Sequence, residues 1–150
     1  MALQAKYVHT NLIAHDWRKL AAFYEGVFGC VPLPPERNLY GEAFDRLTHL
    51  KDARLCGVHL RLPGFGEDGP TLEIFEYAEM LARLEPAVDR PGFAHIAFLV
   101  PDVQAAYNAV LDAGGEAVGE IVTMSIGGRN FTGVYMTDPE GNIVELQSWS

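Results

Sequence analysis

Hydrophobic and polar positions along this chain follow two different periods. Residues 17–28 and 103–111 carry apolar side chains at helical spacing, which predicts one amphipathic helix in each half. Alternating or continuous apolar runs predict strands near residues 7–13, 43–50, 54–62, 71–77, 93–100, 116–124 (a weak one), 130–137 and 142–149. The pattern predicts an α+β fold in which each half runs strand, helix, then two or three strands.

The two halves look like copies of one module. Near the start of each half, an offset of 86 residues places His9 on His95 and Asp16 on Asp102. Near the end the offset falls to 72, which places Glu73 on Glu145. We therefore expect one module over residues 5–77, a second over 93–149, and a connection over 78–92 that begins with a short helix at 78–84.

The change of offset implies about 14 extra residues in the first module. Residues 31–52 contain Pro32, Pro34, Pro35 and Gly41 and are the obvious place for most of them. Length changes are tolerated best in loops. We expect most of this segment to be a loop, either a rim over a binding site or a plain surface excursion.

Several residues mark the ends of elements. Asp16 and Asp102 precede the two helices and are suitable N-caps, and Gly29 suits the end of the first helix. The run 138–142, Asp-Pro-Glu-Gly-Asn, predicts a tight turn before the last strand. Glu76 falls on the apolar side of its strand, which we interpret as a frayed strand end.

Composition limits the partners of the chain. With 150 residues it forms one domain or two small modules, and its net charge of −9 argues against nucleic acid and anionic membranes. No apolar run reaches membrane-spanning length, and the start of the chain has no secretory-signal pattern. Cys30 and Cys56 lie in apolar stretches and are expected to be reduced thiols, with a disulfide as the alternative. These features favour a cytoplasmic protein with a small-molecule partner.

Four side chains are candidates for a metal site. Each half opens with a strand histidine, His9 or His95, and closes with a strand glutamate, Glu73 or Glu145. Their strand faces mix aromatic and polar residues, as ligand cavities do. Two imidazoles and two carboxylates on one concave face require a compensating charge, which a divalent ion such as Zn²⁺, Ni²⁺, Co²⁺, Mn²⁺ or Fe²⁺ supplies. The alternative is that each is an ordinary structural or surface residue.

Other residues are candidates for substrate contact. Asn11 and Phe75 share strand faces with His9 and Glu73, and His59 and Arg61 share a face of their own strand. Arg129, which follows Gly127-Gly128, could bind an anionic group or be a solvated loop residue. The glycine pair is not a phosphate loop, because no matching lysine or helix start follows it.

Several segments together resemble the vicinal oxygen chelate superfamily, which includes glyoxalase I, methylmalonyl-CoA epimerase, extradiol dioxygenases, and the fosfomycin and bleomycin resistance proteins. The resemblance covers nearly the whole chain, and its carriers are residues 8–12, 23–29, 72–77, 92–98 and 138–146. It implies two tandem βαβββ modules that form a cupped mixed sheet around a metal. It also implies that His9, Glu73, His95 and Glu145 are the ligands, and that the protein is a homodimer.

The order His, Glu, His, Glu is that of the glyoxalase I-like enzymes. This resemblance implies a lyase, isomerase or epimerase in which Glu145 or Glu73 removes a proton next to a carbonyl and the metal stabilises an enediolate. Residues 10–15 lack the arginine that glyoxalase I uses to hold glutathione, so glutathione is in doubt. The alternatives are an Fe²⁺ extradiol-type dioxygenase using His9, His95 and Glu145, and a non-catalytic binding protein for an antibiotic or metabolite.

Overall fold

The structure, a computed structural model, describes residues 1–150 and divides the chain into two compact units, Met1–Ala82 and Arg83–Ser150. The first unit contains β1 (His9–Ile13), α1 (Trp17–Phe28), β2 (Val31–Tyr40), α2 (Glu42–Thr48), β3 (Arg54–Arg61) and β4 (Thr71–Tyr77). The second contains β5 (His95–Leu99), α3 (Val103–Asp112), β6 (Glu116–Ala117), β7 (Val122–Ile126), β8 (Arg129–Thr137) and β9 (Ile143–Trp149). The predicted α+β fold with two βαβββ modules is confirmed. No helix is long and apolar enough to cross a membrane.

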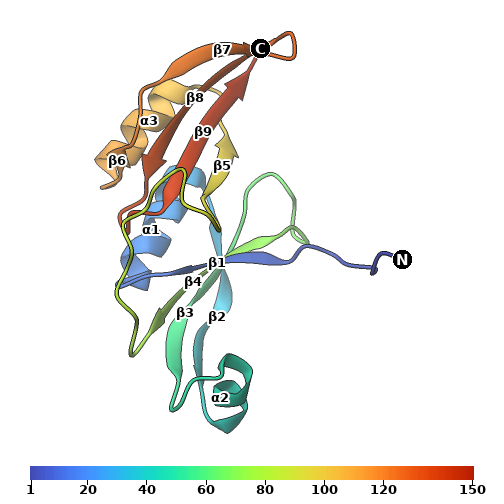
Figure 1. Cartoon of the computed structure of the whole chain (residues 1–150), viewed down its shortest axis with the longest axis vertical. Helices are drawn as coiled ribbons and strands as arrows, with labels where there is room; N and C mark the ends of the chain where they lie inside the picture. The colour runs from blue at the N-terminus through green and yellow to red at the C-terminus, as the bar shows by residue number, and fades with distance from the viewer. The chain divides into compact units, whose positions relative to one another are not determined.

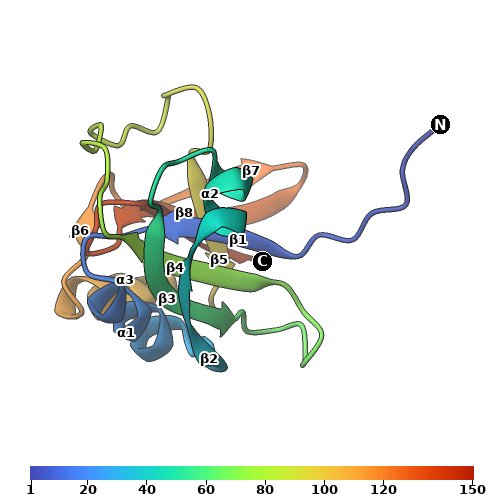
Figure 2. The same ribbon diagram turned by 90° about the horizontal axis from the view of Figure 1, so that it is seen from below.

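Both units have one mixed sheet with the same topology. The first sheet has the order β1-β4-β3-β2, and the second β5-β9-β8-β6 with β7 also paired to β8. In each, the first strand runs parallel to the last, and the other pairs are antiparallel. Helix α1 packs on β3 and β4, as Figure 2 shows, and α3 packs on β8 and β9 (Figure 1). The duplication seen in the sequence is therefore a duplication of structure.

One face of each sheet forms the core with its helix. In the first unit the largest fully buried side chains of this core are Leu20, Tyr24, Leu60, Leu72 and Ile74. In the second they are Val110, Met136, Asp138, Val144 and Leu146. Alternate strand residues supply these cores. The side chains between them, among them His9, His59 and His95, point to the opposite face.

The predicted helix caps are present. The Asp16 side chain accepts a hydrogen bond from the Lys19 backbone N–H, and the Asp102 side chain accepts one from that of Ala105. Gly29 ends α1 with a φ of 69°, a left-handed conformation in which glycine carries no steric cost.

Glu76 is not at a frayed strand end, because it caps the neighbouring helix. The Trp17 backbone N–H donates to Glu76 Oε2 over 3.2 Å. Trp17 is the first residue of α1, so this N–H has no partner within the helix. A carboxylate is also favourable at the positive end of the helix dipole. The Glu76 carboxylate therefore lies on the apolar face of β4, where its hydrogen bond connects the strand to the N-terminus of α1.

Replacing Glu76 by alanine is expected to lower the free energy of unfolding by about 1.5 kcal/mol, because it removes a charged cap from a partly buried N–H. Glu76→Gln keeps an acceptor oxygen and should lose less than half of that. Urea unfolding measures both, with the exposed Glu79→Gln as the matched control. A Glu76→Ala protein as stable as this control would show that the cap contributes nothing.

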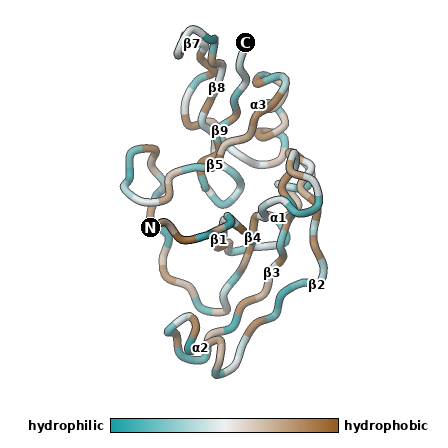
Figure 3. The backbone as a smooth tube through the Cα atoms, turned by 90° about the vertical axis from the view of Figure 1, so that its right-hand side faces the viewer, coloured by the Kyte–Doolittle hydropathy of each residue, from teal (hydrophilic) through white to brown (hydrophobic).

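The expected loop at 31–52 and strand at 43–50 are both wrong. Residues 31–40 form β2, an exposed edge strand whose hydrophilic stretch is teal in Figure 3. Prolines are tolerated on an edge strand because its outer N–H groups need no partner. Residues 42–48 form helix α2, whose Phe44 ring stacks on Tyr77 at a centroid distance of 6.3 Å. Phe44 and Leu47 also fit helical spacing, so this short apolar run was ambiguous.

Three smaller expectations also change. Residues 78–84 form no helix, and the weak strand at 116–124 is two short strands, β6 and β7. Both cysteines are free, as expected, but only Cys30 is buried, whereas Cys56 is exposed. Burial raises the pKa of the Cys30 thiol to about 11.

Candidate functional site

His9 and Glu73 form a close pair in the first unit. Their strands β1 and β4 are parallel neighbours in which Asn11 aligns with Glu73. His9 Nε2 lies 3.0 Å from Glu73 Oε1. The imidazole is 41% exposed and the carboxylate only 10%, so the glutamate is nearly buried and the histidine is partly open to solvent.

The second unit repeats this pair. In the parallel pair β5 and β9, Ala97 aligns with Glu145, so the glutamate again lies opposite the second residue after the histidine. His95 Nε2 lies 3.0 Å from Glu145 Oε2. The four predicted ligands therefore form two equivalent His–Glu pairs, one in each unit. No group of three or more His, Cys, Asp or Glu side chains in the structure is arranged to hold a metal ion.

The first unit adds a third imidazole. His59 lies on β3 directly opposite Glu73, and its Nε2 is 2.7 Å from Glu73 Oε2. Burial lowers the pKa of His59, an effect that the negative charge of Glu73 opposes. Sequence reasoning suggested that His59 contacts substrate, whereas the structure places it against a predicted ligand. Only the register of β3 on β4 reveals this contact.

Tyr135 occupies the matching place in the second unit, where it lies opposite Glu145. Its ring centroid is 5.0 Å from that of His95. Two residues before His59 and Tyr135 there is a glycine in each unit, Gly57 and Gly133, and each leaves space for an aromatic ring. A Cβ at Gly57 would lie 2.6 Å from the Phe75 ring, and one at Gly133 would lie 2.3 Å from the Phe131 ring. Sequence reasoning missed Tyr135 and Phe131, because only the pairing of β8 with β9 shows that Tyr135 lies opposite Glu145, with Phe131 on the same strand face.

A profile of the Glyoxalase/Bleomycin resistance protein/Dioxygenase superfamily matches residues 6–146 of the chain. The chain belongs to this superfamily. A search of curated proteins gave no match.

Solved structures of the superfamily share the fold. A glyoxalase family protein from Bacillus cereus is 19% identical, with a TM-score of 0.79 over 99% of this chain and 95% of its own. One from Enterococcus faecalis is 20% identical, with a TM-score of 0.62 over 95% and 96%. A glyoxylase/bleomycin resistance protein/dioxygenase domain from Frankia sp. EAN1pec is 16% identical, with a TM-score of 0.65 over 99% and 100%. At these identities the likeness shows the fold alone.

The remaining candidate residues of this superfamily member lie in different settings. Asn11 Nδ2 donates to the Glu73 backbone oxygen at 3.5 Å, and the buried Phe75 ring lies 5.7 Å from the His59 ring. Arg61 is half-buried two residues beyond His59 on the same strand face. The Arg129 guanidinium lies 5.3 Å from the Trp149 ring centroid. Asn11 and Phe75 are therefore next to a His–Glu pair, whereas Arg129 lies at the far end of β8.

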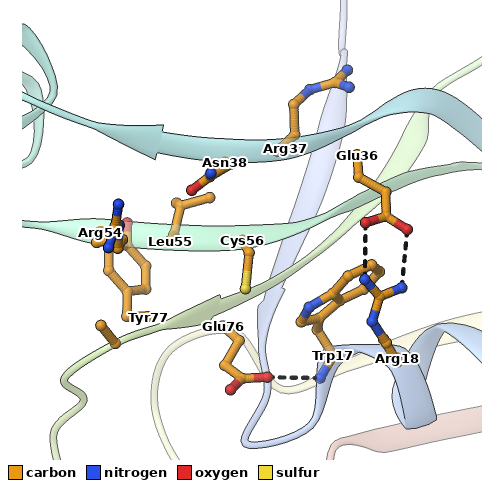
Figure 4. Close-up of a pocket in the computed structure, with 11 residues that line it drawn as sticks. Trp17, Arg18, Glu36, Arg37, Asn38, Arg54, Leu55, Cys56, Glu76 and Tyr77 are labelled. Carbon is orange, nitrogen blue, oxygen red and sulfur yellow. Dashed lines mark hydrogen bonds and ion pairs between the residues drawn. The ribbon is translucent and has the colours of Figure 1, made fainter.

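Figure 4 shows a cavity of about 490 Å³ in the first unit, and neither His9 nor Glu73 lines it. Its lining includes Trp17, Cys56, Glu76 and the Arg18–Glu36 ion pair. Cys56 and Glu76 each lie three residues from His59 and Glu73 on the same strands, which puts them on the opposite face of the sheet. This cavity is therefore not part of the candidate metal centre.

Proposed function

We propose that this protein is a divalent-metal-dependent lyase, isomerase or epimerase that moves a proton next to a carbonyl of a small metabolite. The observation that carries the proposal is the repeated His–Glu pair, with the same strand register and the same 3.0 Å separation in both units. A structural role for one such pair is ordinary, but two equivalent pairs on duplicated sheets favour a shared function.

The chemistry of the donors fits a transition metal. Imidazole nitrogens and carboxylate oxygens are common protein ligands of such ions, and each unit holds one of each 3.0 Å apart. The identity of the donor atoms and their repetition in both units favour a metal site. Two imidazoles and two carboxylates would hold Zn²⁺, Ni²⁺, Co²⁺, Mn²⁺ or Fe²⁺ and leave room for substrate. His9, Glu73, His95 and Glu145 would be the ligands.

The protein's own groups would handle the proton. A bound metal supplies a Lewis acid that polarises the oxygens of a carbonyl substrate. A carboxylate, Glu145 or Glu73, would then accept the proton from the adjacent carbon and return it to the neighbouring one. Asn11 and Phe75 lie beside the first pair and would contact the substrate. We also propose that the protein is a cytoplasmic homodimer, and light scattering on the purified protein tests whether it is a dimer.

Metal analysis of protein purified without chelators or an affinity tag tests this proposal. We expect about one equivalent of a transition metal in the wild-type protein, as in other single-ion sites. His9→Ala and Glu145→Ala should lose it, because each removes one of four ligands, and the exposed His15→Ala should keep it. No metal in the wild-type protein, even after addition of each candidate ion, would overturn the proposal. Bound iron with oxygen uptake on a catechol would replace it by a dioxygenase.

A further inference from the structure

Glu73 and Glu145 occupy equivalent places but have different partners. Both oxygens of Glu73 contact imidazoles: Oε1 is 3.0 Å from His9 Nε2, and Oε2 is 2.7 Å from His59 Nε2. Within its own unit, Glu145 forms an ion pair with His95 alone. A buried carboxylate is stabilised by each charge-assisted hydrogen bond that it accepts. The orientation of Glu73 is therefore fixed at both oxygens, and that of Glu145 at one.

The surroundings of His59 define which nitrogen donates. Its Nδ1 lies 3.5 Å from Thr71 Oγ1, a hydroxyl that can donate or accept. A carboxylate oxygen only accepts, so His59 Nε2, which faces Glu73, carries a proton. The Nε2–H then points at Glu73 Oε2 over 2.7 Å. The side chain is 20% exposed and its ring lies 5.7 Å from that of Phe75, so it is held by packing as well.

We propose that His59 is a positioning residue that orients Glu73 as a fixed metal ligand. Its Nε2–H holds Glu73 Oε2 and leaves Oε1, on the His9 side, for the metal. Tyr135 stands at the matching place in the second unit, so that unit lacks this imidazole and Glu145 keeps the freedom that a proton acceptor needs. The two units thus have different tasks, one holding a ligand and one moving a proton. This proposal rests on the proposed function.

The affinity for Co²⁺ measures the effect of His59. His59→Phe keeps a ring but removes the donor, and the loss of such a supporting hydrogen bond is expected to weaken metal binding by about 10- to 100-fold. His59→Gln restores an N–H donor and should recover most of the affinity. Tyr135→Phe, the matched change in the second unit, should leave it unchanged. Calorimetric titration gives the affinities, and the visible spectrum of bound Co²⁺ should change for His59→Phe but not for Tyr135→Phe.

Equal affinity and spectrum for His59→Phe and the wild-type protein would overturn the proposal. An equal loss in His59→Phe and His59→Gln would also overturn it, because the donor would then be irrelevant. Absence of binding of Co²⁺ and of every other candidate ion by the wild-type protein would instead overturn the proposed function. In that case ¹⁵N NMR of the metal-free protein still tests the hydrogen bond between His59 and Glu73. We expect the ring ¹⁵N shifts of the Nε2–H form of His59, and we expect Glu73→Leu, but not Glu145→Leu, to change them. Finding the Nδ1–H form would contradict the hydrogen bond itself.

Discussion

Replacing Glu145 by glutamine is expected to lower turnover by about 10²- to 10⁴-fold, the usual contribution of a general base, while the metal stays bound. Glutamine keeps an oxygen that can bind a metal but cannot accept a proton. Glu145 is the better candidate for the base because it forms an ion pair with one imidazole, that of His95, whereas two imidazoles hold Glu73. The measurement is deuterium uptake from D₂O at the carbon next to the carbonyl, over a panel of small hydroxyketones and thiohemiacetals.

Glu73→Gln is the matched control for this experiment. It makes the same chemical change at the equivalent place in the other unit. We expect it to weaken the metal site and to retain more turnover than Glu145→Gln once the metal concentration is saturating. If Glu73→Gln alone abolished deuterium uptake, the base would be Glu73. Metal content measured on both variants separates a lost ligand from a lost base.

The regular strands were predictable from the sequence because side-chain alternation decides which residues are buried. Strand β4 begins and ends at the predicted residues, Thr71 and Tyr77. Prediction failed where local signals conflict with tertiary pairing. The prolines of β2 indicate a loop unless the strand is known to lie at a sheet edge. Helix α2 has only seven residues, too few for the spacing of its apolar side chains to distinguish a helix from a strand.

The candidate site divides in the same way. Equivalent positions in a duplicated chain were enough to select His9 and Glu73, together with their counterparts His95 and Glu145, as one group. What the sequence could not supply is the cross-strand register that places His59 on Glu73. Register depends on how whole strands pair, and a shift of one residue would turn His59 to the other face. The capping role of Glu76 was hidden for a similar reason, because its partner lies on a helix far away in the sequence.

Replacing Asp138 by alanine is expected to lower the free energy of unfolding by about 3 kcal/mol, because it leaves three part-buried donors of this turn without their acceptor. The carboxylate is 2% exposed. Its Oδ1 accepts from the backbone N–H groups of Glu140 and Asn142, each at 2.9 Å, and its Oδ2 accepts from Asn142 Nδ2 at 2.8 Å. Because this turn joins β8 to β9, it also helps to fix the register that places Tyr135 opposite Glu145.

Asp138→Asn is expected to recover about half of this loss, since it keeps an oxygen for the two backbone donors. Its amide nitrogen would face Asn142 Nδ2, and rotation of the Asn142 amide would break the hydrogen bond that its Oδ1 accepts from Arg83 at 3.0 Å. Urea unfolding of both variants is compared with Asp68→Ala, which removes an exposed carboxylate from the β3–β4 connection of the first unit. A midpoint for Asp138→Ala equal to that of Asp68→Ala would show that the turn forms without its buried carboxylate. The predicted order, with Asp68→Ala the most stable and Asp138→Ala the least, would instead make this side chain the element that fixes the start of the strand carrying Glu145.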